Sequence, residues 1–304
     1  MSEYAALFGG SGDSYWTSGS IGAFSIKAIN NSGLDATGDY ATAEGYGTLA
    51  SGAGSHAEGG DGSFGMPGGT ASGIASHAEG YGTFAIGESA HAEGRNTTAS
   101  GNRSHAQGWN TTALGLASHA EGINTIALAA DSHAEGSSTT ASGVTSHAEG
   151  EGTRSLGQSS HAEGGGSESW GIRSHAEGTT TTAVGVGSHS EGRYTTAIGD
   201  GSHAEGHTTT AIGNGSHAEG GYYTTSGGTV TGGTAIGISS HAEGQSTIAS
   251  GSTSHAEGQQ TTAIGTASHA EGYYTTASGQ QSHAGGYQSI ASGQTSFVHG
   301  SGST

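Results

Sequence analysis

Ser, His and Glu recur together in a five-residue motif, Ser-His-Ala-Glu-Gly, which returns along most of the chain. A serine, a histidine and a carboxylate are the residue types of a hydrolase triad. In an extended strand, however, neighbouring side chains point to opposite faces, so each Ser is directed away from the His beside it. A catalytic site also needs one pocket rather than sixteen similar copies. We therefore predict no catalytic residues and a protein that is not an enzyme.

His and Glu are also ligands for Zn²⁺ or Ni²⁺, and in the motif they lie two residues apart, on one face of a strand. No further ligand type clusters with them. Gln107 and Gly285 replace Glu in two of the sixteen motifs, a gap that a hydrogen-bonded ladder tolerates better than a metal site does. The pattern favours the ladder, and we predict no metal site and no cofactor.

The motif recurs with a period of fourteen residues. His returns at this interval from His77 to His217 and, after an insertion at 221–233, from His241 to His283; His56 precedes an insertion near 60–70. One period consists of Ser-His-Ala-Glu-Gly, two variable residues, Thr-Thr-Ala-(Ile/Ser)-Gly and two more variable residues. Such repetition is typical of solenoids, and we expect an array over 28–304 of about nineteen coils.

Two five-residue segments joined by two-residue turns predict two short strands per coil. Glycines at two places in every period disfavour a helical repeat. We predict an all-β fold, a parallel β-roll solenoid with two short strands per 14-residue coil. Alternation directs Ser, Ala and Gly of each motif inward, and only small side chains fit inside so narrow a roll. His and Glu then share one outer face, and the second Thr and the Ile/Ser position share the other.

Composition excludes several classes of function. The chain has 304 residues, 62 of them Gly, no Cys and a formal net charge of −19, which repels nucleic acid and anionic membranes. The N-terminus lacks the basic start and apolar run of a secretory signal, and no stretch reaches membrane-spanning length. We predict no nucleic-acid partner and no membrane insertion.

The two ends of the chain depart from the repeat. Residues 1–27 carry Trp16, Ile21, Phe24 and Ile26 in alternation and are interpreted as a cap or attachment segment, because the ends of solenoids need cover. The C-terminal sequence SFVHGSGST places Phe297 in the His position and ends on an unfinished coil. We expect this end to be uncapped.

Ser-x-Ala-x-Gly strands at a period of fourteen resemble the head repeats of YadA-like trimeric adhesins. The resemblance covers about nine-tenths of the chain and implies a left-handed parallel β-roll that forms a homotrimer. The inner strand of that family, which faces the trimer axis, is approximately Ser-Val-Ala-Ile-Gly. Matched to Ser-His-Ala-Glu-Gly, it puts His in the Val position and Glu in the Ile position, at the axis. The motifs SHAEG and TTASG are also similar to repeat motifs of phage tail-fibre and other virion proteins.

The orientation of the two outer faces stays open. Glu is nearly constant, as expected of a face packed against copies of itself, whereas the Ile position varies through Ile86, Ser100 and Trp170. Burying charge, on the other hand, costs several kcal/mol per ion unless the ion is paired. The opposite orientation, with Ile and Leu at the axis and His and Glu in water, is therefore an alternative. The pH dependence of stability is likewise open, because Glu raises and burial lowers a His pKa.

The function that these features favour is a structural, non-enzymatic trimeric fibre or spike of a phage tail or virion, a rigid extension for host attachment. Its expected partners are two copies of itself, other virion or fibre proteins, and a host receptor or glycan. The lack of a signal and of a membrane anchor favours a virion location over a bacterial surface. Alternatives are the head of a cell-surface trimeric adhesin and a self-assembling extracellular filament. Aromatic residues at the turns could stack on sugars or shield neighbouring coils: Trp109, Tyr194, Tyr222, Tyr223, Tyr273 and Tyr274.

Overall fold

A computed structural model describes residues 16–18, 25–28, 35–60, 67–223 and 229–304. The chain divides into two compact units, unit 1 (Met1–Ser142) and unit 2 (Gly143–Thr304). Each described part consists of strands and turns, and no helix in it is long and apolar enough to cross a membrane. Each unit is a parallel β-solenoid, so the predicted fold class is confirmed.

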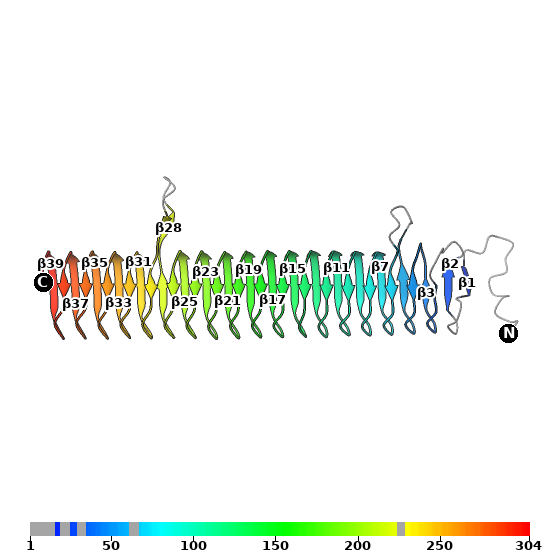
Figure 1. Cartoon of the computed structure of the whole chain (residues 1–304), viewed down its shortest axis with the longest axis horizontal. Coiled ribbons are helices and arrows are strands. Elements are labelled where there is room, and N and C mark those ends of the chain that lie inside the picture. The colour runs from blue at the N-terminus through cyan, green and yellow to red at the C-terminus, as the bar shows by residue number, and fades with distance from the viewer. Residues whose placement is uncertain (1–15, 19–24, 29–34, 61–66, 224–228) are drawn as a thin grey trace. The chain divides into compact units, whose positions relative to one another are not determined.

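In unit 1, two series of strands alternate along the chain (Figure 1). The first series carries the His and Glu positions and comprises β3 (Thr42–Ala43), β5 (His56–Glu58), β7 (His77–Tyr81), β9 (His91–Arg95), β11 (His105–Trp109), β13 (His119–Ile123) and β15 (His133–Ser137). The second series comprises β4 (Leu49–Ala50), β6 (Thr70–Ala71), β8 (Phe84–Ala85), β10 (Thr98–Ala99), β12 (Thr112–Ala113), β14 (Ile126–Ala127) and β16 (Thr140–Ala141).

Unit 2 repeats this plan. Its first series comprises β17 (His147–Glu151), β19 (His161–Gly165), β21 (His175–Thr179), β23 (His189–Arg193), β25 (His203–His207), β27 (His217–Glu219), β31 (His241–Gln245), β33 (His255–Gln259), β35 (His269–Tyr273), β37 (His283–Tyr287) and β39 (Phe297–Ser301). Its second series comprises β18 (Arg154–Ser155), β20 (Glu168–Ser169), β22 (Thr182–Ala183), β24 (Thr196–Ala197), β26 (Thr210–Ala211), β30 (Thr234–Ala235), β32 (Ile248–Ala249), β34 (Thr262–Ala263), β36 (Thr276–Ala277) and β38 (Ile290–Ala291).

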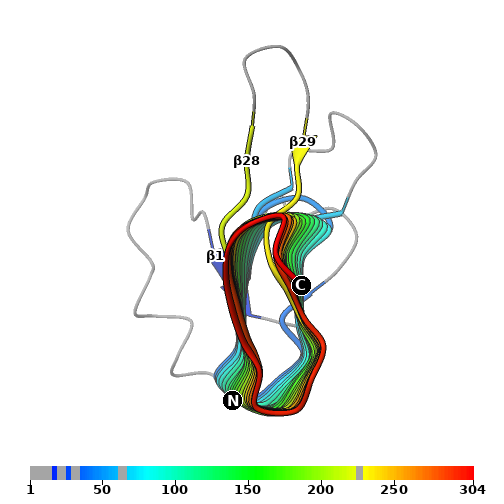
Figure 2. The same ribbon diagram turned by 90° about the vertical axis from the view of Figure 1, so that its left-hand side faces the viewer.

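Consecutive coils pair in parallel and in register, so that like residues stack on like. Between β11 and β13, for example, His105 lies opposite His119 and Ala106 opposite Ala120. Viewed along the coils, the last coil of unit 2 is a flattened loop whose two long sides carry the two strand series (Figure 2). Each sequence position therefore generates a straight column of identical or related side chains within a unit.

The interior of each coil is filled by small side chains, as predicted. The Ala of both strand series is fully buried, and so are the Ser that precedes each His and the first Thr of each Thr-Thr pair. The largest fully buried side chains of the described residues are threonines. Burial of Ala and of Thr methyl groups supplies little apolar area per residue, so the backbone hydrogen bonds between coils hold much of the structure.

The second strand is shorter than the sequence predicts, two residues rather than five. Its end is set by the turn that follows. After β10, the N–H groups of Ser100 and Gly101 both donate to the carbonyl of Ala113, at 2.9 and 3.4 Å, which bends the chain out of the ladder. The first strand begins at His rather than Ser and extends one residue past the Gly.

The predicted cap and insertions interrupt the regular coils. β1 (Trp16–Ser18) pairs antiparallel with β2 (Ile26–Ala28), and Ile26 of β2 lies opposite Thr42 of β3 in parallel. Ile21 and Phe24 lie outside the described residues, as does most of the insertion near 60–70. In the insertion of unit 2, β28 (Tyr222–Tyr223) and β29 (Thr229–Val230) form an antiparallel pair that projects from one edge of its coil (Figure 2).

Candidate functional site

The histidines of the motif form a stacked column on the outer face of the first strand series. In unit 1, the rings from His56 to His133 stack with centroids 4.7 to 4.8 Å apart and interplanar angles of 5° or less. In unit 2, the rings from His147 to His269 stack at 4.7 to 4.9 Å. The centroid spacing follows the parallel strand spacing, so the backbone ladder dictates the stack.

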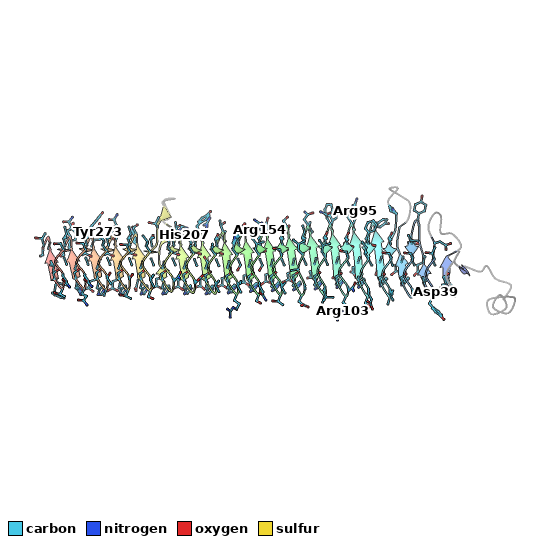
Figure 3. The ribbon with its side chains drawn as sticks, turned by 60° about the horizontal axis from the view of Figure 1, so that its bottom comes forward. Asp39, Arg95, Arg103, Arg154, His207 and Tyr273 are labelled. Carbon is cyan, nitrogen blue, oxygen red and sulfur yellow. The ribbon has the colours of Figure 1, made fainter. Side chains whose placement is uncertain are left out.

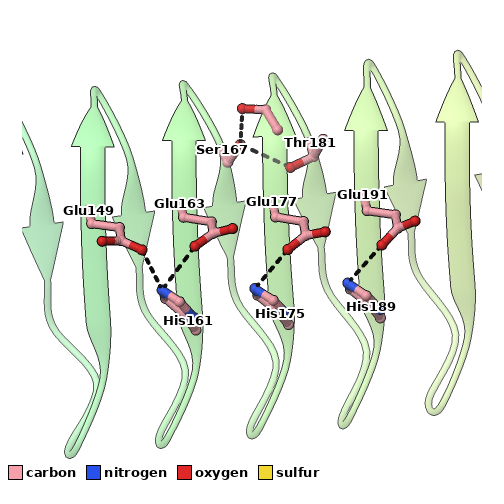
Figure 4. Close-up of polar contacts among 10 residues, drawn as sticks. Glu149, His161, Glu163, Ser167, His175, Glu177, Thr181, His189 and Glu191 are labelled. Carbon is pink, nitrogen blue, oxygen red and sulfur yellow. Dashed lines mark hydrogen bonds and ion pairs between the residues drawn. The ribbon is translucent and has the colours of Figure 1, made fainter.

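The glutamates form a second column beside the histidines, and each faces an imidazole. His119 Nε2 lies 3.5 Å from Glu121 of its own coil, whereas His77 Nε2 lies 3.3 Å from Glu58 of the preceding coil. His161 is close to both kinds of neighbour, 3.4 Å from Glu149 and 3.8 Å from Glu163 (Figure 4). The imidazole and carboxylate side chains are about one-third exposed within one chain. We call this surface the His/Glu face.

The Ser of the motif has a structural role. Ser104 Oγ is buried and donates to the carbonyl of Gly101 at 2.6 Å, which closes the turn that leads into β11. The same bond recurs along the chain, for example from Ser188 to Gly185. His105 lies on the opposite side of the strand, half-exposed. The Ser and His of one motif therefore do not meet, as the alternation predicts.

Four of the imidazoles have a lowered pKa, and the cause is physical. Burial is the main cause that lowers the pKa of His105, and the neighbouring imidazoles of His119 and His91 lower it further. Glu93 and Glu121 raise this pKa, but their effect is smaller than that of burial. Of the two directions left open by the sequence, burial prevails here and also at His91, His161 and His189.

The carboxylates are close enough to perturb one another. Burial and then hydrogen bonding to Glu191 and Glu163 raise the pKa of Glu177. A hydrogen bond with Glu149 lowers the pKa of Glu163. Two carboxyl groups that share a proton have pKa values shifted in opposite directions, because one group donates the hydrogen bond and the other accepts it.

The two departures from the motif rearrange the column locally. Gln107 Nε2 donates to Glu93 Oε1 at 2.8 Å, so an amide takes the place of a carboxylate against its neighbour. In the coil with Gly285, His283 instead pairs with Glu271 of the preceding coil at 3.1 Å, and this bond lowers the pKa of Glu271. The rings of His269 and His283 are tilted by 54° there, which shows that the column can accommodate a rotated imidazole.

Aromatic side chains gather at the turn edge that follows the first strand. In unit 1, Arg95 lies over Trp109 with 5.9 Å between the guanidinium carbon and the ring centroid, and Arg103 lies on the opposite edge (Figure 3). In unit 2, Tyr273 stacks on Tyr287 at 5.4 Å and meets Tyr274 edge-on at 4.3 Å. The Arg95–Trp109 and Tyr273–Tyr287 contacts link neighbouring coils, as the shielding interpretation predicts, whereas Tyr273 and Tyr274 belong to one coil.

The outer face of the second strand series carries more exposed apolar side chains than the sequence interpretation identified, because the first turn position adds to the Ile/Ser position. Exposed apolar side chains recur there at the second Thr, Ile/Ser and first turn positions, and we call them the apolar row. They are Ile74, Phe84, Ile86, Leu114, Leu116, Ile126 and Leu128 in unit 1, and Val144, Trp170, Ile172, Val184, Val186, Ile198, Ile212, Ile236, Ile238, Ile248, Ile264 and Ile290 in unit 2. Ile86 is 49% and Ile238 61% exposed. The signal was present in the sequence, but variation at the Ile/Ser position obscured it.

The coil geometry and the repeat agree with a known protein family. The family model of the YadA head domain repeat matches residues 78–104, 106–128, 176–202, 204–222, 231–254, 256–282 and 270–296, more than half of the chain. The chain belongs to the YadA head repeat family. YadA-type heads are adhesin-like structural proteins and are trimeric in general, and they are extracellular or located at the cell surface.

The other comparisons add little to this YadA-type assignment. A search of curated proteins found no match. Among solved structures, the chain is similar to the crystal structure of the polySia specific acetyltransferase NeuO at 10% identity, over 85% of this chain and 78% of that one. The TM-score of 0.10 is too low to support any argument from that likeness.

Proposed function

We propose that this YadA-type repeat protein is a structural, non-enzymatic subunit of a trimeric fibre, and that the apolar row forms the contact between its chains. The observation that carries the proposal is the row itself. Its seven members in unit 1 and twelve members in unit 2 give each unit an exposed apolar patch of its own. Exposed apolar patches of this extent mark interaction sites. A row with the spacing of stacked coils fits best against another row of the same spacing, which a copy of this chain provides.

Energetics support burial of the apolar row. Fully burying an aliphatic side chain contributes about 1.5 to 3 kcal/mol, and these side chains are still about 40 to 60% exposed, so each adds about 1 kcal/mol on association. The sum over the row offsets the loss of freedom on association, which costs about 4 to 15 kcal/mol. Arg154 and Glu168, at second-Thr positions of the row, form a mutual ion pair at 3.2 Å, whereas Glu88 and Asp200 place carboxylates at its first turn position.

Charge argues against contact through the His/Glu face. That face presents a column of carboxylates, and a chain with a net charge of −19 has few cations to oppose them. Packing two such columns together would bring like charges into a desolvated contact. The sequence alternative, with Ile and Leu at the axis and His and Glu in water, is therefore the orientation that we propose. Ala211, Ile212 and Gly213 also match the last three residues of Ser-Val-Ala-Ile-Gly, the inner strand of the family.

The test is the mass of the full chain in solution, measured by native mass spectrometry or sedimentation. We expect the wild type to have the mass of three chains. The double variant Leu114→Asp/Leu128→Asp should shift the population to monomer, because it buries two carboxylates at the contact. Ile123→Asp, which changes an apolar residue at the turn edge of the same unit, is the matched control and should stay trimeric.

Two outcomes contradict this arrangement. A monomeric wild type would refute the trimer. Dissociation by Glu121→Arg together with an intact trimer in the Leu114/Leu128 variant would place the His/Glu face at the axis instead.

We further propose a virion location, as an extension in a phage tail that binds other fibre proteins and a host receptor or glycan. The support is the similarity of the SHAEG and TTASG motifs to virion proteins; the alternative is the head of a bacterial surface adhesin. Gold-labelled antibodies against the chain should decorate phage particles rather than the surface of the bacterium that encodes it. Rods of one length in electron micrographs would favour a fibre over an end-to-end filament.

A further inference from the structure

The imidazole and carboxylate columns are spaced for a metal ion in the middle of unit 2. His161 Nε2 lies 3.4 Å from Glu149 Oε1 of the preceding coil and 3.8 Å from Glu163 Oε2 of its own coil (Figure 4). Zinc binds nitrogen and oxygen ligands at about 2.0 to 2.2 Å, so two ligands of a tetrahedral ion lie about 3.4 Å apart. One imidazole and two carboxylates are therefore already near the required separations.

The same nitrogens lack the hydrogen bonds that a purely structural ladder would provide. In seven imidazoles that lie near a carboxylate, the Nε2 atom is sealed from solvent and has no hydrogen-bond partner. They are His91, His119, His161, His175, His189, His203 and His255. Their carboxylate neighbours lie at 3.4 to 3.9 Å, within ion-pair range but outside hydrogen-bond geometry. A buried polar atom without a partner calls for an explanation, and binding of an ion is one.

The ligand types of the column also suit a transition-metal cation. The geometry of one nitrogen with carboxylate oxygens is typical of zinc and related transition metals rather than of Ca²⁺ or Mg²⁺.

We propose that the His/Glu face binds divalent transition-metal ions, Zn²⁺ in the first place, with one imidazole nitrogen and the two flanking carboxylates at each site. Water completes the coordination. We assign each site the single imidazole that lies between two carboxylates, as His161 lies between Glu149 and Glu163. Other coils place an imidazole beside one carboxylate, as at His119 and Glu121, 3.5 Å apart, so we expect similar sites along each unit. This extends the proposed structural role without depending on the trimer.

The test is zinc uptake by the full chain after it has been stripped with a chelator, measured by calorimetry and by metal analysis after dialysis. We expect saturable binding of several ions per chain. Glu149→Gln/Glu163→Gln should bind at least one ion fewer, because both flanking carboxylates of His161 become amides. Gln107→Glu should bind at least one more, because it restores the carboxylate that flanks both His105 and His119. Glu168→Gln, on the opposite face, is the matched control and should leave the number unchanged.

The fold of each variant is checked by circular dichroism, since Gln107 shows that an amide fits this column. Absence of saturable zinc uptake, or the same stoichiometry in all four proteins, overturns the proposal. The Leu114→Asp/Leu128→Asp variant separates it from the trimer. Zinc uptake that persists in the monomeric variant supports sites made within one chain, whereas uptake lost with the trimer refutes them.

Discussion

The Gly that ends each Ser-His-Ala-Glu-Gly motif provides the strictest test of the coil geometry. All eighteen first-series coils of the described residues have Gly there, and each has a positive φ. Gly178 has φ +114°, and a Cβ added to it would lie 2.1 Å from the carbonyl oxygen of Gly192 in the next coil. We predict that Gly178→Ala separates β21 from β23.

The expected magnitude has two parts. A backbone conformation that non-glycine residues rarely adopt costs about 1 to 3 kcal/mol. The Cβ also forces the neighbouring carbonyl away by more than its hydrogen bonds tolerate, and each lost bond costs about 1 kcal/mol. We therefore expect a destabilisation of about 3 to 5 kcal/mol, concentrated in the coils on either side of Gly178.

The assay is hydrogen exchange across β21 and β23 together with chemical denaturation, because solenoid coils need not unfold in one step. Gly187→Asn is the matched control. Gly187 also has a positive φ, +63°, but nothing lies within 4 Å of an added Cβ, and Asn tolerates this conformation. The control should change stability by less than about 0.5 kcal/mol. Equal protection of β21 in the two variants would refute the close-approach argument.

Two further predictions concern pH and the interior, besides the mass and zinc measurements above. The histidines with a lowered pKa in the folded state are His91, His105, His161 and His189. Because the unfolded chain binds protons more readily at these sites, their contribution to the free energy of unfolding is complete above pH 6.5. It falls as the pH drops from there through the lower pKa values of the folded state. Melting curves over this pH range check the prediction, and a melting temperature that rises on acidification would contradict it. Ala204→Leu should destabilise by about 1 to 3 kcal/mol or more through overpacking, whereas Ala204→Ser should fold normally, because Ser190 occupies the same position one coil earlier; similar denaturation midpoints for the two variants would refute a filled interior.

The fold was predictable because its causes are local and repeated. A fourteen-residue period with small residues at alternate positions leaves few ways to bury side chains, and the buried Ala columns, including Ala106 and Ala120, confirm that argument. The strand limits were predicted less well, since the end of β10 depends on which carbonyl the N–H of Gly101 selects. That choice is a matter of hydrogen-bond geometry, which residue type alone does not encode.

The His/Glu face was predicted in composition and register, but not in its energetics. The sequence shows that His and Glu share a face. The structure adds that His161 Nε2 is sealed from solvent and forms no hydrogen bond with the carboxylates of Glu149 and Glu163. The apolar row was foreseen at the Ile/Ser position, as the alternative orientation, but not at the first turn position. Leu116 and Ile172 occupy a position that sequence assigned to a variable turn, and their alignment with Leu114 and Trp170 emerges only when the coils are stacked.

The two outer faces of the coil have different proposed roles, contact between chains for the apolar row and metal binding for the His/Glu face. A column of carboxylates packed against its own copy brings like charges together, which is unfavourable. A column of Ile, Leu and Val packed against its copy buries apolar surface, which stabilises the contact. If the apolar row lies between chains, the His/Glu face lies outside that contact, with its imidazole and carboxylate side chains still about one-third exposed. The same arrangement that makes the trimer favourable thus leaves the metal-ligating column open, and the monomeric Leu114→Asp/Leu128→Asp variant measures each face without the other.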